Sequence, residues 1–262
     1  MQTTLRPSGK GLSRRDLFGL GATVFGSAVA RIARAGQSAR RVVVWSEGTA
    51  PVDKVYPDDV NTAIAAGLRR LLPEWQVETA GLDSPEQGCT EESLQRCDVL
   101  IWWGHKRHGE VKDAYVDRIE RRVKQEGMGF IAVHSAHFAK PNKRLMGTRC
   151  GWAAYKTDGC RLEVEIKEPN HPISAGVSAF TLPQIERYSE PYQVPAPDAV
   201  PLAGTYVYPD GRREPTRVGL CWTIGKGRMF YFAPGHETYP NLNRPEVQRV
   251  FANAVQWAAA SR

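Results

Sequence analysis

The sequence predicts an α/β fold with an open, mostly parallel sheet, helices on both faces and antiparallel additions in the C-terminal half. Two observations lead to this prediction. In the first half of the chain, short apolar runs alternate with segments of helical periodicity, which is typical of parallel strands joined by crossover helices. From Cys160 onward, apolar and polar residues alternate at a period of two, which is typical of antiparallel strands.

The first half of the chain contains four predicted strands and two predicted helices. The strands are expected at residues 41–45, 75–80, 98–103 and 129–134. The helices are expected at residues 58–72 and 113–126. Asp58 or Asp59 can cap the first helix, and Gly127 ends the second. The third strand is apolar throughout after Asp98, as strands buried on both faces of a parallel sheet are.

The second half contains three further predicted strands and a last helix. Residues 161–166 form an alternating strand, and residues 218–232 form two strands about the turn at 225–227. Residues 245–259 form an amphipathic helix that is expected to cover the sheet. Its apolar face consists of Val247, Val250, Phe251, Ala254, Val255 and Trp257.

Residues 13–35 have the pattern of a bacterial twin-arginine export signal. Arg14 and Arg15 precede an uncharged apolar run at 17–30, and Ala33-Arg34-Ala35 is a small-residue cleavage pattern. The run is shorter than the roughly 20 residues that a helix needs to span a bilayer, so no permanent membrane anchor is expected. The sequence therefore predicts a signal peptide at 1–35, a single domain at 36–262, and a periplasmic or secreted protein.

The predicted signal changes how the net charge is interpreted. The chain has 35 Lys and Arg and 28 Asp and Glu, but six of the basic residues and one acid lie in residues 1–35. The remaining chain keeps 29 basic and 27 acidic residues, which is a net charge of +2. The basic composition is thus no argument for nucleic acid as a partner.

Five cysteines are present and none forms a C-x-x-C pair. An oxidising compartment would permit a Cys89–Cys97 or a Cys150–Cys160 bridge, and the sequence establishes neither.

Four of the six histidines come directly after a predicted strand or in its turn: His105, His134, His137 and His236. Because open α/β sheets bind ligands outside the carboxyl ends of their strands, these side chains are expected to share one crevice. His105, His134 and His137 are predicted ligands of zinc or a similar divalent ion, while His236 and Glu237 are predicted catalytic groups. The spacing matches no known metal signature, so structural roles for single histidines stay open.

Ser135 lies at the strand–turn–helix position that nucleophiles occupy in many α/β enzymes, and it is the third predicted catalytic residue. The glycines of a G-x-S-x-G motif are absent, since Val133 and His137 take their places. A hydroxyl that only caps the following helix is the alternative. Covalent catalysis would need His236 within reach of Ser135.

Four further residues are predicted to contact a substrate. Glu47 follows the first strand, and His108 and Tyr239 lie in loops beside predicted site residues. Of the adjacent Trp102 and Trp103, which alternate across a strand, Trp103 is the one expected to stack on a sugar near His105. Core packing of both indoles, and a solvated position for His108, are the alternatives.

Several motifs together resemble the ThuA, or trehalose-utilization, family over residues 41–259. They lie at residues 54–58, 104–105, 127–138, 145–148, 230–240 and 247–255. The resemblance implies a flavodoxin-like fold similar to the class I glutamine amidotransferase domain. Those amidotransferases carry a nucleophilic cysteine where this chain has Ser135, and Cys150 is the nearest cysteine, so glutamine hydrolysis through a thiolate is not expected.

The resemblance also implies a role in sugar catabolism. The leading hypothesis is an enzyme that isomerises, eliminates or hydrolyses a disaccharide-derived glycoside or 3-keto-sugar, with metal assistance and without a nucleotide cofactor. The alternatives are a non-catalytic sugar-binding protein and a Ser135-dependent hydrolase. The substrate linkage, the metal and the oligomeric state are left open.

Overall fold

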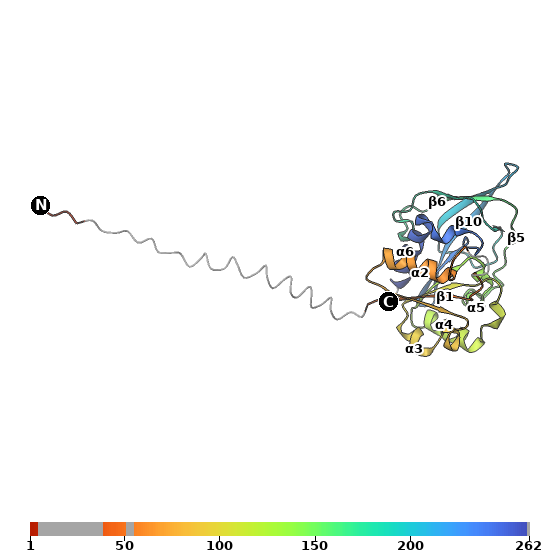
Figure 1. Ribbon diagram of the computed structural model, residues 1–262, viewed down its shortest axis with the longest axis horizontal. Coiled ribbons are helices and arrows are strands. Elements are labelled where there is room, and N and C mark those ends of the chain that lie inside the picture. The colour runs from red at the N-terminus through yellow and green to blue at the C-terminus, as the bar shows by residue number, and fades with distance from the viewer. Residues whose placement is uncertain (5–38, 51–54, 261–262) are drawn as a thin grey trace. The chain divides into compact units, whose positions relative to one another are not determined.

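The computed structural model describes residues 1–4, 39–50 and 55–260. Residues 40–262 form one compact unit, shown with its helices and strands in Figure 1. The predicted export signal lies outside the described residues. Within the described part of the chain, no helix combines the length and the apolar character that crossing a membrane requires.

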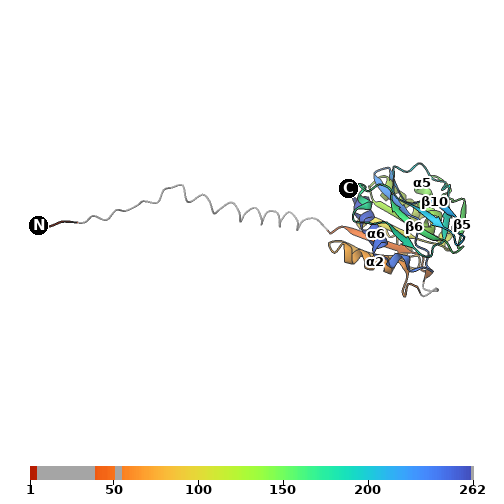
Figure 2. The same cartoon turned by 90° about the horizontal axis from the view of Figure 1, so that it is seen from above.

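A nine-stranded sheet forms the centre of this unit, in the order β2-β1-β3-β4-β11-β10-β9-β6-β7. Its parallel half consists of β2 (Gln76–Gly81), β1 (Arg41–Ser46), β3 (Val99–Trp103), β4 (Gly129–Val133) and β11 (Gly227–Phe232). Its antiparallel half adds β10 (Arg213–Ile224), β9 (Ala199–Val207), β6 (Arg161–Ile166) and β7 (Phe180–Leu182). In both views β6 and β10 lie close together (Figures 1 and 2). The predicted mixed α/β architecture is therefore confirmed.

One strand was assigned to the wrong half of the sheet. The sequence places β11 among the antiparallel additions, because it follows β10 after a tight turn. The structure pairs β11 antiparallel with β10 but parallel with β4. A hairpin thus joins the two halves of the sheet, and the carboxyl end of β11 lies at the same edge as those of β3 and β4.

Helices cover both faces of the sheet, as Figure 1 shows. The helices are α2 (Val60–Leu71), α3 (Glu91–Arg96), α4 (Asp113–Lys124), α5 (Lys140–Met146) and α6 (Pro245–Ala259). Asp59 is the N-cap residue of α2 and forms a capping box with Thr62. The Asp59 side chain accepts from the backbone N–H of Thr62, and the Thr62 hydroxyl oxygen accepts from the backbone N–H of Asp59. The period of two in β1 sends Val42 and Val44 to the face covered by α2 and α6, and Val43 to the face covered by α3 and α4.

Short segments outside the main sheet shape the site. A separate strand pair joins β5 (Ala154–Lys156) to β8 (Arg187–Ser189). The 3-10 turns are η2 (Pro85–Gly88), η3 (His108–Glu110), η4 (His134–Phe138), η5 (Pro172–Ser174) and η6 (Pro240–Asn243). Of these segments, the sequence predicts only a short helical stretch after residues 129–134, where η4 lies. The others, and α3, α5, β7 and β9, were not predicted, because each is short or lacks a continuous periodic pattern.

Candidate active site

Three neighbouring strands bring three histidines together at the carboxyl edge of the sheet. His105 follows β3, His134 follows β4, and His236 follows β11. The ring centroids are 5.8 Å apart for His105 and His134, 4.8 Å for His105 and His236, and 5.3 Å for His134 and His236. The three imidazoles thus form a triangle, and two glutamates complete this histidine cluster, Glu186 and Glu237.

His134, directly after β4, has a strained backbone conformation. Its φ is +55°, in the left-handed region that residues other than glycine seldom adopt. Two contacts hold this conformation: the His134 Nδ1–H donates to the Ala233 carbonyl at 2.9 Å, and the Tyr231 hydroxyl donates to the His134 carbonyl at 3.1 Å. The strained position of the strand–turn–helix segment therefore belongs to His134 rather than to Ser135.

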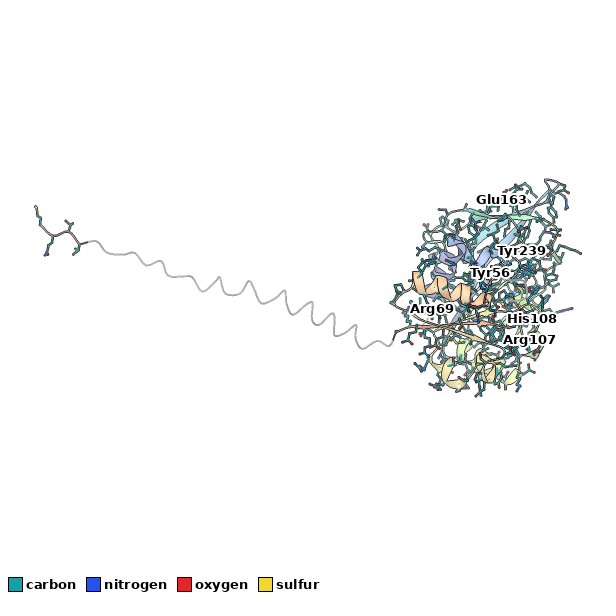
Figure 3. The ribbon with its side chains drawn as sticks, viewed as in Figure 1. Tyr56, Arg69, Arg107, His108, Glu163 and Tyr239 are labelled. Carbon is teal, nitrogen blue, oxygen red and sulfur yellow. The ribbon has the colours of Figure 1, made fainter. Side chains whose placement is uncertain are left out.

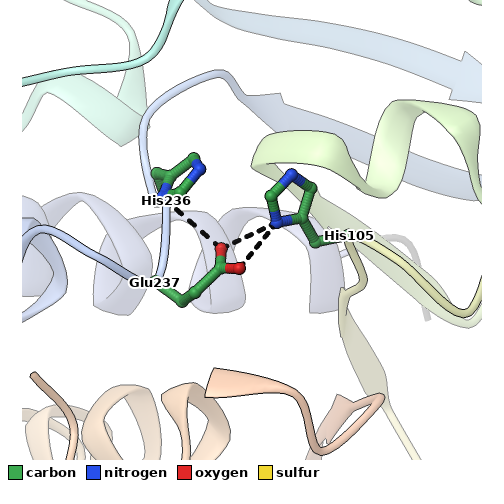
Figure 4. Close-up of side chains that lie close together, drawn as sticks. All are labelled: His105, His236 and Glu237. Atoms are coloured by element: carbon green, nitrogen blue, oxygen red, sulfur yellow. Dashed lines mark hydrogen bonds and ion pairs between the residues drawn. The ribbon is translucent and has the colours of Figure 1, made fainter. Parts of the chain in front are cut away.

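Glu237 holds the ring of His105 in place. The His105 Nδ1 lies 2.7 and 2.9 Å from the two carboxylate oxygens of Glu237, as Figure 4 shows. The ammonium of Lys106 lies 3.1 Å from the same carboxylate. Burial lowers the pKa of His105, but the Glu237 contact outweighs it and the pKa is raised. Burial likewise raises the pKa of Glu237, but the His105 hydrogen bond outweighs this effect and the pKa is lowered.

Glu186 lies between the other two imidazoles of the cluster. Its Oε2 lies 3.1 Å from His134 Nε2 and 4.0 Å from His236 Nε2. This oxygen is buried and makes no hydrogen bond of good geometry with any described residue. Because the His134 Nδ1–H is used by the Ala233 carbonyl, a neutral His134 points its Nε2 lone pair at the Glu186 carboxylate. The Tyr188 hydroxyl lies 3.1 Å from the same Nε2, so a proton from this hydroxyl, a proton on His134 or a cation can lie between the two acceptors.

The electrostatics of this group keep the Glu186 carboxylate ionised. Burial lowers the pKa of His236 to about 4, so its ring is neutral at pH 7. Burial raises the pKa of Glu186, but the neighbouring His134 outweighs it and the pKa is lowered to about 2. The carboxylate is therefore ionised, and among the described residues no Lys or Arg pairs with it.

The donors around Glu186 suit a small divalent ion. A tetrahedral site with ligand bonds of about 2.0–2.1 Å separates its ligand atoms by roughly 3.3 Å, a value that lies between the two Glu186 separations. His236 Nδ1 accepts from the Thr238 backbone N–H at 3.2 Å and lies 2.7 Å from Thr238 Oγ1, so its Nε2 is the ring nitrogen that faces Glu186. A second group, His105 with His236 and Glu237, is also close enough to hold an ion, but Lys106 already neutralises its carboxylate.

The structure places two predicted site residues beside the histidine cluster. The Ser135 hydroxyl lies 2.6 Å from the Tyr188 hydroxyl, and no imidazole of the described residues is hydrogen-bonded to it. His137 was predicted as a metal ligand beside His105 and His134. Its ring instead stacks on Tyr155, its Nδ1 lies 2.6 Å from the Cys150 carbonyl, and it belongs to neither ion-binding group of the described residues.

Glu47 was predicted to bind substrate, but in the structure its carboxylate accepts hydrogen bonds from the protein backbone. The side chain is 1% exposed and accepts from the backbone N–H of Lys106 and of Arg107. It thereby fixes the loop that carries His105. His108, shown beside Arg107 in Figure 3, lies next to this loop. Burial lowers the pKa of His108 to about 4.

Trp103 does not offer a face to a sugar. It is fully buried, and its indole N–H donates to the Gly235 carbonyl at 3.0 Å, which ties β3 to the loop before His236. Trp102 is buried on the opposite face, where it stacks on Trp45 at 3.6 Å. Tyr239 remains half-buried with its ring 5.5 Å from that of His236, and Figure 3 shows it close to Tyr56, whose hydroxyl donates to its carbonyl.

Sequence reasoning missed Glu186 and Tyr188. Tyr188 stacks on His134 with the ring centroids 4.9 Å apart, and its hydroxyl lies 3.1 Å from His134 Nε2. Both residues come from the segment at β8, which pairs only with β5 outside the main sheet. No strand-end pattern marks this segment, so the sequence carries no signal that would have found them.

Comparison with known proteins gives a consistent result. The family model described as trehalose utilisation, ThuA, matches residues 41–258. A ThuA-like protein from Parabacteroides merdae has a similar structure, with a TM-score of 0.60, 14% identity, and coverage of 86% of this chain and 91% of that chain. This likeness shows a shared fold. A search of curated proteins found no match.

Two further solved structures are similar at lower scores. One is a glutamine amidotransferase from Thermotoga maritima, with a TM-score of 0.48, 9% identity, and coverage of 85% of this chain and 99% of that chain. The other is described as a GMP synthase component from Thermoplasma acidophilum, with a TM-score of 0.49, 10% identity, and coverage of 86% of this chain and 96% of that chain.

Proposed function

The chain belongs to the ThuA, or trehalose-utilisation, family, and from that premise we propose that it is an exported enzyme acting on a disaccharide-derived glycoside or 3-keto-sugar. The family is linked to carbohydrate metabolism. The observation that carries the proposal is the histidine cluster, in which the imidazole held by Glu237 lies beside two further imidazoles and the Glu186 carboxylate that faces them. Polar groups of this kind at one sheet edge are costly unless they serve a ligand.

Glu237 and Glu186 have different roles in this proposal. Glu237 is fully buried and paired, so it orients His105 rather than reacting itself. The Glu237 contact raises the pKa of His105 above its ordinary value, and an imidazole at this position can serve as a general acid or base. A ketone at C3 acidifies the neighbouring C–H, and removing that proton begins either isomerisation or elimination of the glycosidic oxygen.

A divalent ion would be held by His134, Glu186 and His236. Its chemistry there would be to polarise the substrate carbonyl as a Lewis acid. The chain's own contribution is to fix the tautomer of His134 through the Ala233 carbonyl.

Metal analysis of matched glutamate variants tests this proposal. Purified wild type is expected to contain about one ion per chain, Glu186→Gln to lose at least tenfold in metal affinity, and Glu237→Gln to keep the metal. Both variants are expected to lose turnover of 3-keto-trehalose. Substoichiometric metal in the wild type would sink the metal assignment.

Activity measurements separate the alternatives. A sugar-binding protein would retain ligand affinity with no turnover of any keto-glycoside. A serine hydrolase would lose all activity in Ser135→Ala and would be indifferent to a chelator. We expect Ser135→Ala to retain activity, because its hydroxyl is bonded to Tyr188 rather than to an imidazole.

A further inference from the structure

A cavity of about 520 Å³ lies beside η4, outside the histidine cluster. Its volume is in the range of sites that bind small molecules. The residues that matter for its chemistry are Phe138, Lys143, Arg149, Trp152, Tyr155 and Gln193. None of them belongs to the catalytic groups proposed above, so the cavity requires its own explanation.

Two aromatic rings form rigid walls of this cavity. Tyr155 stacks on His137 with the ring centroids 5.5 Å apart and the planes 2° apart. Trp152 stacks on Tyr192 at 4.2 Å and 1°. Each ring is held from one side by its partner, which fixes the plane that it presents. Trp152 is 5% exposed and packs within the wall, whereas the half-buried Tyr155 can offer its free ring face to the apolar face of a sugar.

The charges on the cavity are positive and uncompensated. Lys143 and Arg149 line it, and neither forms an ion pair with a carboxylate of the described residues. The adjacent Arg144, in contrast, is paired with both Asp117 and Glu120 outside the cavity. None of the described residues that line the cavity is acidic, so an anion entering it would meet two cations and no repulsion.

The wall of the cavity packs against the histidine cluster through aromatic contacts. The ring of Tyr155 contacts that of Tyr188 with the centroids 5.3 Å apart, and Tyr188 in turn stacks on His134 at 4.9 Å. The cavity wall therefore lies no farther from His134 than the sum of these two separations. Because Tyr188 is buried between them, a ligand in the cavity is separated from His134 by this ring.

We propose that this cavity binds the anionic group of a charged sugar, a phosphate or a carboxylate, through Lys143 and Arg149. The sugar class rests on the proposed function, whereas the preference for an anion rests on the cavity alone. Gln193, whose side-chain amide makes no hydrogen bond with another described residue, supplies a neutral donor and acceptor for the sugar hydroxyls.

Calorimetric binding of three disaccharides tests the proposal: trehalose, trehalose 6-phosphate and a glucuronosyl-glucose. We expect at least one anionic sugar to bind about tenfold or more tightly than trehalose, as charged hydrogen bonds imply. Lys143→Gln and Arg149→Gln should each reduce that preference. Lys226→Gln is the matched control, because Lys226 is exposed in the turn before β11, at the other end of that strand from His236.

The outcomes are distinct from those of the function test. Equal affinity for all three sugars, no binding of any of them, or a preference that survives Lys143→Gln/Arg149→Gln would overturn the cavity assignment. An anion preference without keto-glycoside turnover would support the cavity assignment and contradict the proposed reaction. Stronger binding of the phosphate or of the carboxylate identifies which anion the cavity takes.

Discussion

Two substitutions distinguish the effect of the left-handed backbone of His134 on stability from the effect of its imidazole ring. His134→Ala and His134→Gly both remove the imidazole, but only alanine keeps a Cβ at a φ of +55°. Glycine adopts this region freely, whereas alanine is strained by about 1–2 kcal/mol. We therefore expect His134→Gly to be more stable than His134→Ala by about 1 kcal/mol, measured by urea denaturation. If His134→Ala is instead the more stable variant, as alanine is at most buried positions, the backbone at residue 134 leaves the left-handed region when the side chain is changed.

The pair of His105 and Glu237 predicts a pH dependence of stability. The folded-state pKa of His105 is raised, so its contribution is fully present below the unfolded value of about 6.5 and is lost as pH rises through the folded value. Glu237, with its lowered pKa, stays ionised over this window. The difference in unfolding free energy between wild type and His105→Gln should be largest at pH 6 and smaller at pH 9.

The control for this prediction is the Glu237→Gln background. Without the carboxylate, the pKa of His105 loses the interaction that raises it, so introducing His105→Gln there should give a difference that no longer falls with pH. Urea denaturation of the four proteins at pH 6, 7.5 and 9 completes the cycle. A wild-type difference that is constant over this range would contradict the ion pair.

At the scale of elements, the loop between β3 and η3 depends on one buried carboxylate. Glu47 accepts two backbone N–H groups, from Lys106 and Arg107, and Glu47→Gln leaves only one acceptor oxygen for them. We expect a cost of about 1–3 kcal/mol and faster amide exchange over residues 104–110, with β4 unaffected. Glu110→Gln is the control, since Glu110 is exposed and contacts Arg107 mainly through its side chain.

The elements also show what the sequence can and cannot specify. The strands before His105, His134 and His236 are apolar runs, and the rule that parallel strands share a carboxyl edge brings these residues together. The orientation of β11 could not be predicted, because a hairpin turn specifies only its pairing with β10. Glu186 was not predictable either, since it reaches the cluster from β8, whose three residues pair with β5 through contacts that no local pattern encodes.

Trp103 illustrates the same limit at one position of a strand. A period of two correctly sends Trp102 and Trp103 to opposite faces, and the pattern alone leaves open whether either face is accessible. The structure covers one face with α2 and α6 and the other with α3 and α4, so both indoles are buried. Burial on both faces is a property of the assembled layers rather than of the strand.

At the scale of the whole molecule, the thiols bear on how the protein folds. All five cysteines are buried, and Cys89, Cys150 and Cys160 are free, so neither of the bridges that the sequence permits is formed. Burial raises the pKa of Cys89 to about 12 and raises that of Cys221, which suppresses the reactive thiolate at neutral pH. The described fold therefore contains no disulfide whose formation would need an oxidising compartment.

Because the described cysteines form no disulfide, we expect the protein to be equally stable whether it is purified from the cytoplasm or from the periplasm. Residues 36–262 purified from the cytoplasm, and the mature protein purified from the periplasm, should have the same melting temperature with and without reductant. Iodoacetamide at pH 8 should leave the native thiols unmodified and alkylate all five in urea, as counted by mass spectrometry. A melting temperature that falls by several degrees in reductant, or a thiol count below five in urea, would reveal a disulfide and contradict the buried-thiol arrangement.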